Sequence, residues 1–286
     1  MEEKTWIPKT ELGKKVQSKE ITDIDTVLNA GQAILEAEIV ENLLDLETEL
    51  LLIGQAKGKF GGGQRRVFRQ TQKKTKEGNK PRFTTLAVVG DKNGHVGIGS
   101  GKAKETVLAR EKAIRKSKLN VFTIARGSGS WESRSSDPHT IPFAVEGKCG
   151  SVIIKLLPAP KGTGLIIEKE CAKVLELAGI SDIWSKTFGQ TKNKINLINA
   201  LEAALRKLVK TKIQDNQIES LAYLKGSAAV KEDSDEAFLE RGISVSKSVS
   251  VDPKDAKPKT VKKNTKKTDK ISNKDKKTSK KTEDKK

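Results

Sequence analysis

The strongest constraint on the fold is a strand, a turn and a second strand near the middle of the chain. Residues 83–90 (FTTLAVVG) are rich in β-branched and apolar side chains and predict a strand. The segment Asp91–Gly94 has the composition of a tight turn, and residues 95–99 (HVGIG) predict a second strand. Together these residues predict a β-hairpin.

Helical patterns lie on both sides of this hairpin. Apolar residues recur at three- and four-residue spacing from Thr26 to Leu46 and predict helical structure, which Gly31 is expected to interrupt. Residues 103–118 predict another helix, whose inner face is expected to carry Val107, Leu108 and Ile114. This order of elements is that of a small sheet backed by helices on one face.

The second half of the chain repeats the mixture of strands and helices. Residues 139–145 and 152–157 predict strands. Helices are predicted at residues 168–177 and 193–208, and the second has a strong apolar stripe. The predicted fold class is therefore α+β, with two modules.

Three segments lack a clear periodic pattern. Residues 1–25 are of mixed charge and predict an extended arm, and residues 49–53 (ELLLI) fit a helix or a strand equally well. Residues 73–82 (KKTKEGNKPR) predict a basic loop, because Gly78 and Pro81 favour turns.

Positive charge indicates the class of partner. The net charge of the 286 residues is +19, and residues 252–286 supply 15 lysines against 6 acidic residues. That low-complexity tail is predicted to be disordered. The remaining residues still carry +10, so nucleic acid is the predicted partner. No stretch approaches the roughly 20 apolar residues of a membrane-spanning helix, so no membrane partner is predicted.

Three groups of residues are candidate RNA contacts. The first is the arginines and lysines of residues 65–82, the second is two lysines before a helix N-terminus, and the third surrounds an aromatic residue that could stack on an unpaired base. The alternatives are solvated surface charges and a tryptophan that packs on its own domain. The predicted contacts are Arg65, Arg66, Arg69, Lys73, Lys74, Lys76, Lys80, Arg82, Lys102, Lys104, Arg126, Trp131 and Arg134.

Catalytic and metal chemistry finds little support. The P-loop spacing fails, because Val96 stands where a glycine is needed and Ala103 follows Lys102. Two cysteines and two histidines are too few for a zinc site or a disulfide framework. We predict no catalytic residue, no metal site and no cofactor.

Two long segments carry a family resemblance. Residues 83–105 (FTTLAVVGDKNGHVGIGSGKAKE) and 138–164 (PHTIPFAVEGKCGSVIIKLLPAPKGTG) resemble the family of the fifth protein of the small ribosomal subunit, in its archaeal and eukaryotic branch. The resemblance covers roughly residues 38–208. It implies a double-stranded-RNA-binding-like N-terminal module and a βαβ-type C-terminal module.

The resemblance also implies partners and a location. The sheet face of the first module and residues 73–82 would lie on small-subunit rRNA, and Arg65, Arg66 and Arg69 would lie near the path by which mRNA enters the subunit, where family members affect decoding accuracy. The chain would be cytoplasmic and part of the ribosome. Contacts to the fourth and eighth small-subunit proteins would involve Pro158, Lys161, Gly162 and Gly164.

The predicted domains follow from these patterns. They are an N-terminal arm and helix (1–37), the double-stranded-RNA-binding-like domain (38–119), the C-terminal α+β domain (120–225), an extension (226–251) and the Lys-rich tail (252–286).

Two other functions remain open from the sequence. A free regulator would bind RNA duplexes without sedimenting with ribosomes. A small-molecule kinase would use the fold of the second module and would bind nucleotides, although catalytic carboxylate clusters near glycine loops are scarce.

Overall fold

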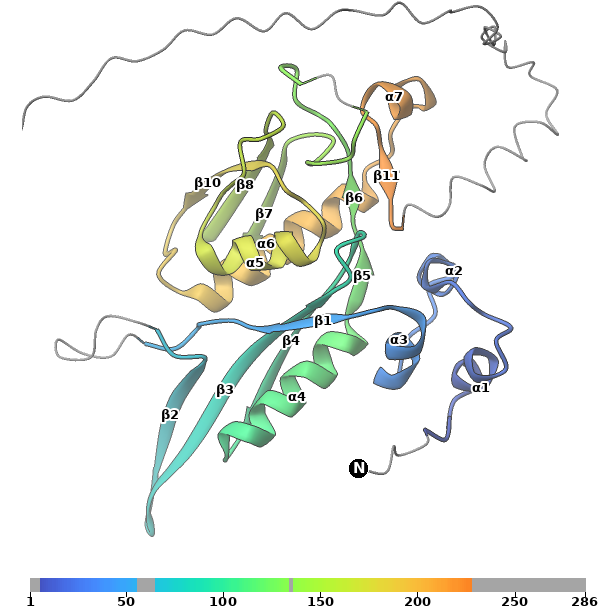
Figure 1. Cartoon of the computed structure of the whole chain (residues 1–286). Helices are drawn as coiled ribbons and strands as arrows, with labels where there is room; N and C mark the ends of the chain where they lie inside the picture. Colours follow the sequence, from blue (N-terminus) through green and yellow to red (C-terminus); the bar gives the residue numbers. More distant parts are fainter. Residues whose placement is uncertain (1–5, 56–64, 134–135, 228–286) are drawn as a thin grey trace, which may run out of the picture. The chain divides into compact units, whose positions relative to one another are not determined.

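The computed structural model describes residues 6–55, 65–133 and 136–227 (Figure 1). In this part of the chain five strands form an antiparallel sheet in the order β1-β3-β4-β5, and β2 also pairs with β3. The predicted hairpin is confirmed as β3 and β4. The strand bounds are β1 Glu47–Leu50, β2 Phe68–Thr75, β3 Gly78–Gly90, β4 His95–Ala103 and β5 Val121–Thr123.

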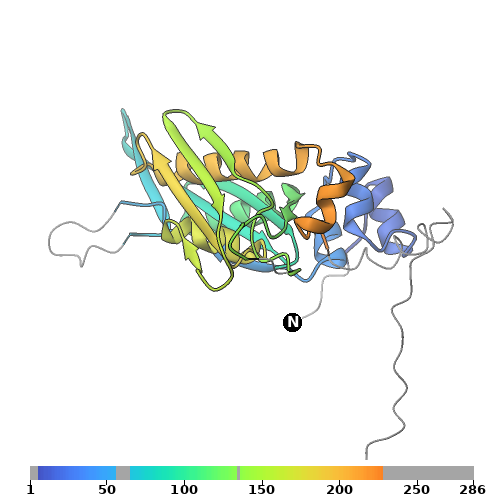
Figure 2. The same ribbon diagram turned by 90° about the horizontal axis from the view of Figure 1, so that it is seen from above.

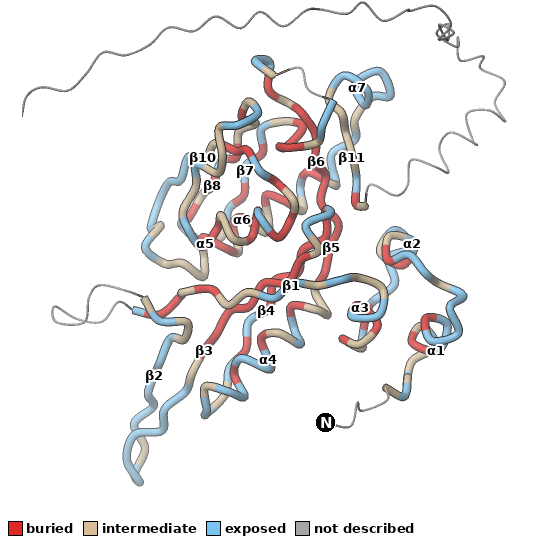
Figure 3. The backbone as a smooth tube through the Cα atoms, viewed as in Figure 1, coloured by how far each residue is buried: buried red, intermediate tan, exposed pale blue. Residues whose placement is uncertain are grey.

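A second hairpin replaces the basic loop predicted at residues 73–82. Strands β2 and β3 pair along the whole of β2, and only Lys76 and Glu77 lie between them. Pro81 is tolerated because it lies beyond the end of β4, where β3 pairs with β2 alone. The loop prediction was wrong because this hairpin, here called the arm, is exposed on both faces (Figure 3). Its sequence therefore lacks the apolar alternation that identifies a half-buried strand.

Helix α4 (Thr106–Leu119) covers one face of the sheet at very short range. A Cβ atom added at Gly99 of β4 would lie 2.2 Å from the backbone nitrogen of Ser117. Only small residues fit such an approach, and the helix accordingly turns Ala109, Ala113 and Ser117 toward the sheet. The predicted inner face was wrong, since Val107 and Leu108 are 59% and 45% exposed.

Substitution of Gly99 by alanine is expected to lower the free energy of unfolding by about 1–3 kcal/mol, because the added methyl group must displace α4. Ser100 is the matched control. It is the next residue of β4 and is exposed, so Ser100→Ala should change stability by less than about 0.5 kcal/mol. Urea unfolding measures both, and equal stability of the two variants would contradict the close packing of α4.

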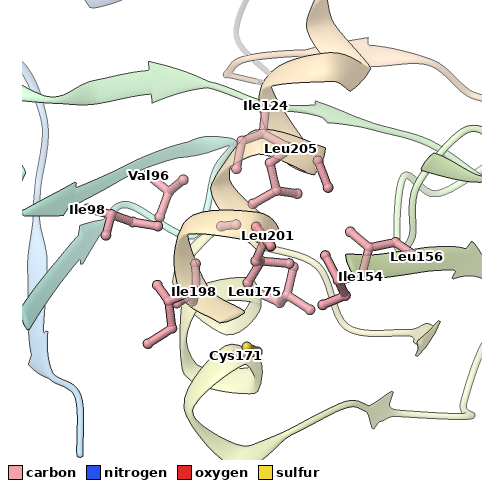
Figure 4. Packing of buried hydrophobic residues seen from close by; sticks show 14 of the residues in the cluster. Val96, Ile98, Ile124, Ile154, Leu156, Cys171, Leu175, Ile198, Leu201 and Leu205 are labelled. Carbon is pink, nitrogen blue, oxygen red and sulfur yellow. The ribbon is translucent and has the colours of Figure 1, made fainter. Parts of the chain in front are cut away.

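The opposite face of this sheet is also buried. Leu86, Val88, Val96 and Ile98 are at most 4% exposed and belong to one core with helices α5 (Lys169–Leu177) and α6 (Lys194–Lys210) (Figure 4). The expectation that this sheet face lies on rRNA is therefore wrong. Within the described residues, the arm and the end of β4 that carries Lys102 extend beyond the covered area.

The second sheet has four strands in the order β7-β8-β10-β9. Strand β9 runs parallel to β10, and α5 connects them, so β9–α5–β10 is a βαβ unit. Figures 1 and 2 show α6 packed beside this sheet. Prediction succeeded for β8 and both helices, but the strand expected at residues 139–145 begins only at Val145. The bounds are β7 Val145–Cys149, β8 Val152–Pro158, β9 Leu165–Ile166 and β10 Ile183–Phe188.

The N-terminal segment folds rather than extending. Helices α1 (Glu11–Gln17), α2 (Ile24–Asn29) and α3 (Ala37–Leu43) surround a small core that includes Val121. Glu36 fixes the start of the chain, because its carboxylate accepts hydrogen bonds from Trp6 Nε1 at 3.0 Å and from the backbone N–H of Thr10 at 2.8 Å. The extended arm predicted at residues 1–25 was therefore wrong, whereas the helical segment interrupted at Gly31 is confirmed as α2 and α3. Residues 49–53 begin within a strand, β1.

A buried charged network joins this segment to the first sheet. His95 is fully buried, and its Nδ1 and Nε2 lie 2.5 Å from Asp91 Oδ2 and 3.0 Å from Asp25 Oδ1. Burial alone would lower the pKa of His95, but the hydrogen bonds and charges of the two carboxylates raise it to about 9. Asp25 also accepts a hydrogen bond from the backbone N–H of Ser227. Through Asp25 and Asp91, His95 therefore connects helix α2, the turn between β3 and β4, and the residue Ser227.

The remaining elements are short. Helix α7 (Asp215–Ser220) precedes β11 (Leu224–Lys225), which pairs with β6 (Ala125–Arg126). None of the helices in the described residues is long and apolar enough to cross a membrane. The predicted extension after residue 227 and the Lys-rich tail lie outside the described residues.

Candidate RNA-binding surface

The arm presents most of its positive charge on one side. Arg69, Lys73, Lys80 and Arg82 occupy alternate positions of β2 and β3, and the register places them on the same face. Lys102 of β4 joins them, because Thr84 pairs with Arg69 on one side and with Lys102 on the other. These five side chains are exposed and are here called the basic face.

The basic face contains a like-charge contact. Lys73 and Lys80 are directly opposite each other in the β2–β3 ladder, an arrangement that destabilises a hairpin in water. Within the described residues one carboxylate, Glu77, pairs with this face, at 2.9 Å from Lys80 Nζ, and both side chains of that pair are mostly exposed. Such a pair contributes little, so the face lacks a compensating charge within the described chain.

A basic pocket lies at the base of the arm. Its volume is about 310 Å³, and its lining includes Arg65 and Arg69 from the arm side and Lys192 and Lys194 from the start of α6. Lys194 is held by Glu168 at 2.7 Å, whereas no ion pair is formed by the other three within the described residues. Sequence reasoning missed Lys192 and Lys194, because they lie more than 120 residues from Arg65 and carry no local signal.

The other predicted lysines and arginines of this region are all at the surface. Arg66, Lys74 and Lys76 are exposed, with Lys74 on the side of the arm opposite the basic face. Lys104 is exposed between β4 and the first turn of α4, as expected. The structure thus brings most of the first two predicted groups into one continuous basic region.

The third predicted group is not held together. Trp131 is 87% exposed and remains free to stack on a base. Arg126 is 7% exposed, and its guanidinium donates hydrogen bonds to the carbonyls of Asn93 and Gly226 at 2.9 and 3.3 Å. The structure therefore places Arg126 in the interior, where it ties loops together and cannot reach RNA. Arg134 lies outside the described residues.

The predicted protein-contact segment is an ordered turn after β8. Gly162 and Gly164 have positive φ angles of 88° and 74°, and the backbone N–H of Gly164 donates to Asp182 Oδ1 at 2.8 Å. Lys161 is exposed and pairs with Asp137 at 2.6 Å, and Pro158 ends β8. Lys161 and Gly162 are exposed, and the partners of this turn remain a prediction.

The described residues show no metal-binding group of three or more His, Cys, Asp or Glu side chains. Both histidines are buried: His95 lies in the network above, and the backbone carbonyl of His139 accepts a hydrogen bond from Ser181 Oγ at 3.1 Å. Cys171 is buried, and burial together with Glu168 raises the pKa of its thiol. Such a thiol is a poor nucleophile.

Comparison with known proteins gives two family matches. Residues 67–125 match the family described as "Ribosomal protein S5, N-terminal domain", and residues 147–218 match "Ribosomal protein S5, C-terminal domain". The first match contains the arm and the second contains α6.

Whole-length relatives agree with these matches. The chain is 47% identical over 223 residues to "Small ribosomal subunit protein uS5" of Nanoarchaeum equitans, which covers 78% of this chain and 96% of the relative. The protein of the same name from Methanocaldococcus jannaschii is 42% identical over 222 residues, covering 77% and 95%. The similarity is thus longer than the span of residues 38–208 in which the resemblance was noted.

Proposed function

Because the chain belongs to the ribosomal protein S5 family, we propose that it is a structural constituent of the small ribosomal subunit that binds rRNA mainly through the arm and the basic pocket. The family is non-enzymatic, and the same assignment makes the chain a component of the translation machinery. Its place of action is the cytoplasmic ribosome.

The observation that carries this proposal is the like-charge pair on the basic face. Lys73 and Lys80 oppose each other on an arm whose side chains are nearly all exposed. The repulsion between them destabilises the hairpin, and little burial of side chains offsets it. A polyanion removes the repulsion. Phosphates of an RNA helix supply closely spaced negative charges, and phosphate contacts position a protein on RNA without reading its sequence.

The module also resembles a double-stranded-RNA-binding domain in outline. Helices α3 and α4 contact each other beside the antiparallel strands β3 and β4. Because its other sheet face is buried, we place the RNA on the arm and on Lys102 and Lys104 instead. The domain boundaries given above, including the one at residues 119 and 120, stay predictions.

The finer placements rest on the family resemblance and on exposure. Exposed Arg66 and Arg69 and partly exposed Arg65, beside the basic pocket, suit the mRNA path and its effect on decoding. The surface turn of Pro158, Lys161, Gly162 and Gly164 suits contacts with the fourth and eighth small-subunit proteins.

Sedimentation of a native lysate tests the proposal. At magnesium low enough to separate the subunits and at raised monovalent salt, the protein should sediment with the small subunit. A protein that stays at the top of the gradient would instead be a free RNA-binding regulator, and the proposal would fail. Since RNA affinity falls steeply with salt, retention there also excludes attachment by screened charge alone.

A further inference from the structure

The second sheet has an outer face that no element of the described chain covers. Its inner face buries Ile154 and Leu156 against the helices. The outer face carries apolar side chains that belong to neither buried core, and two of them, Ile166 and Phe188, are 54% and 50% exposed. The other apolar members are the partly exposed Ile153, Leu157 and Trp184.

The strand registers arrange this face in three rows. Lys148, Ile153 and Phe188 form the first row, and Leu157, Trp184 and Ile166 form the third. The middle row is charged and consists of Glu146, Lys155 and Lys186. The face therefore has two aromatic rings with lysines between them. It carries three positive charges (Lys148, Lys155 and Lys186) and one negative charge (Glu146). We call it the aromatic platform.

We propose that the aromatic platform binds an unpaired segment of RNA by stacking bases on Phe188 and Trp184. Exposed aromatic rings stack with any base, and lysines between them meet the phosphates. Lys155 Nζ lies over the Phe188 ring, 5.9 Å from its centre, and also pairs with Glu146 at 3.1 Å, so Lys186 is the lysine of the middle row without such a pair in the described residues. A protein partner fits less well, because the centre of a protein interface is depleted in lysine, whereas Lys155 and Lys186 occupy the middle of this face.

The edge strand β9 lies near the basic pocket. A second pocket of about 330 Å³ is lined by Ile166 of the platform, by Thr187 and Thr191, and by Lys194. Lys194 lines the basic pocket as well. This second pocket lies on the helix side of the sheet, because Thr187 alternates with Lys186 and Phe188 along β10, and it is therefore separate from the platform itself. The inference depends on the proposed function only in taking RNA as the partner.

Binding of a labelled twelve-residue oligouridylate, measured by fluorescence anisotropy over a series of salt concentrations, tests the proposal. Phe188→Ala and Phe188→Leu should each weaken binding about tenfold at every salt concentration, while Phe188→Tyr keeps the affinity within about twofold. Lys186→Gln should reduce the slope of log affinity against log salt by about 0.7. Leu35→Ala, at a 66% exposed apolar residue outside the platform, is the control and should change nothing.

Two results would overturn the proposal. One is unchanged oligouridylate binding by Phe188→Ala. The other is full binding by Phe188→Leu when Phe188→Ala binds weakly, because an apolar contact without stacking then explains the face. Thermal unfolding confirms that each variant folds. If either of these results is obtained while duplex RNA binding still depends on Lys73 and Lys80, only the platform proposal fails. If the unchanged chain binds neither oligouridylate nor duplex RNA, the proposed function itself is rejected.

Discussion

The free energy of unfolding is expected to fall by about 3 kcal/mol as the pH rises from 6.5 to about 9. The folded chain raises the pKa of His95 from 6.5 to about 9, so the folded state keeps a proton that the unfolded state releases. This stabilisation is complete below pH 6.5 and is lost as the pH passes the folded value. Urea unfolding at a series of pH values measures the change.

Substitution of His95 by glutamine tests the cause. The variant should lose about 3–5 kcal/mol at neutral pH, because Asp25 and Asp91 stay buried without their cation, and its stability should no longer fall between pH 6.5 and 9. Lys92→Gln is the matched control. Lys92 pairs with Glu47 at the surface, with side chains 55% and 60% exposed, so the pH dependence should remain. A glutamine variant that keeps the pH dependence would rule out His95 as its source.

The same network sets the acid limit. Burial would raise the pKa of Asp25 and Asp91, but the hydrogen bonds from His95 and its charge hold both below the ordinary value of 3.8. Their contribution to stability is present above 3.8 and is lost as the pH falls through the lower folded values. The N-terminal helices should therefore stay attached best near neutral and mildly acidic pH.

Neutralising four of the five cations of the basic face should weaken RNA binding on the order of 10³-fold near 0.1 M salt. The variant carries Arg69→Gln, Lys73→Gln, Lys80→Gln and Arg82→Gln. Each lost phosphate contact reduces the slope of log affinity against log salt by about 0.9 for duplex nucleic acid, so a drop of about 3.6 is expected. Because all four side chains are exposed, the fold should be retained and slightly stabilised by removal of the Lys73–Lys80 repulsion.

The control for this variant keeps its charge change but moves it. Replacing Arg110, Lys112, Arg115 and Lys116 of α4 by glutamine neutralises four exposed charges away from the arm. Equal losses of affinity in the two variants would show that net charge, and not the arm, determines binding.

The spacing of apolar residues in the sequence predicted those helices and strands that have one buried face and one exposed face. The hairpin of β3 and β4 was found because Val88, Val89 and Val96 must be buried, and α6 because Leu201, Leu205 and Leu208 share one stripe. The arm was missed as a strand pair because exposed strands impose no such pattern. The inner face of α4 was misassigned because close contact with Gly97, Gly99 and Gly101 favours alanine and serine over larger apolar residues.

Long-range placement limited the prediction of the site. Local charge density was enough to find the cations of the arm. Nothing local shows that Lys192 meets Arg65 in one pocket, or that the carbonyls of Asn93 and Gly226 draw Arg126 inside. The rows of the aromatic platform likewise exist only when β8, β9 and β10 are in register. A site whose residues come from distant segments of the chain therefore gives no pattern in any single segment of the sequence.

Photocrosslinking from the arm in assembled subunits tests the central claim most directly. A benzophenone side chain at Thr71, which pairs with Arg82 on the basic face, should crosslink to small-subunit rRNA. The same group at exposed Asn42 of α3, beside Glu41 and near Asp45, should give far less rRNA product. Crosslinks from Thr71 to protein alone, or equal rRNA yields from both positions, would contradict the claim that the arm holds the chain on rRNA.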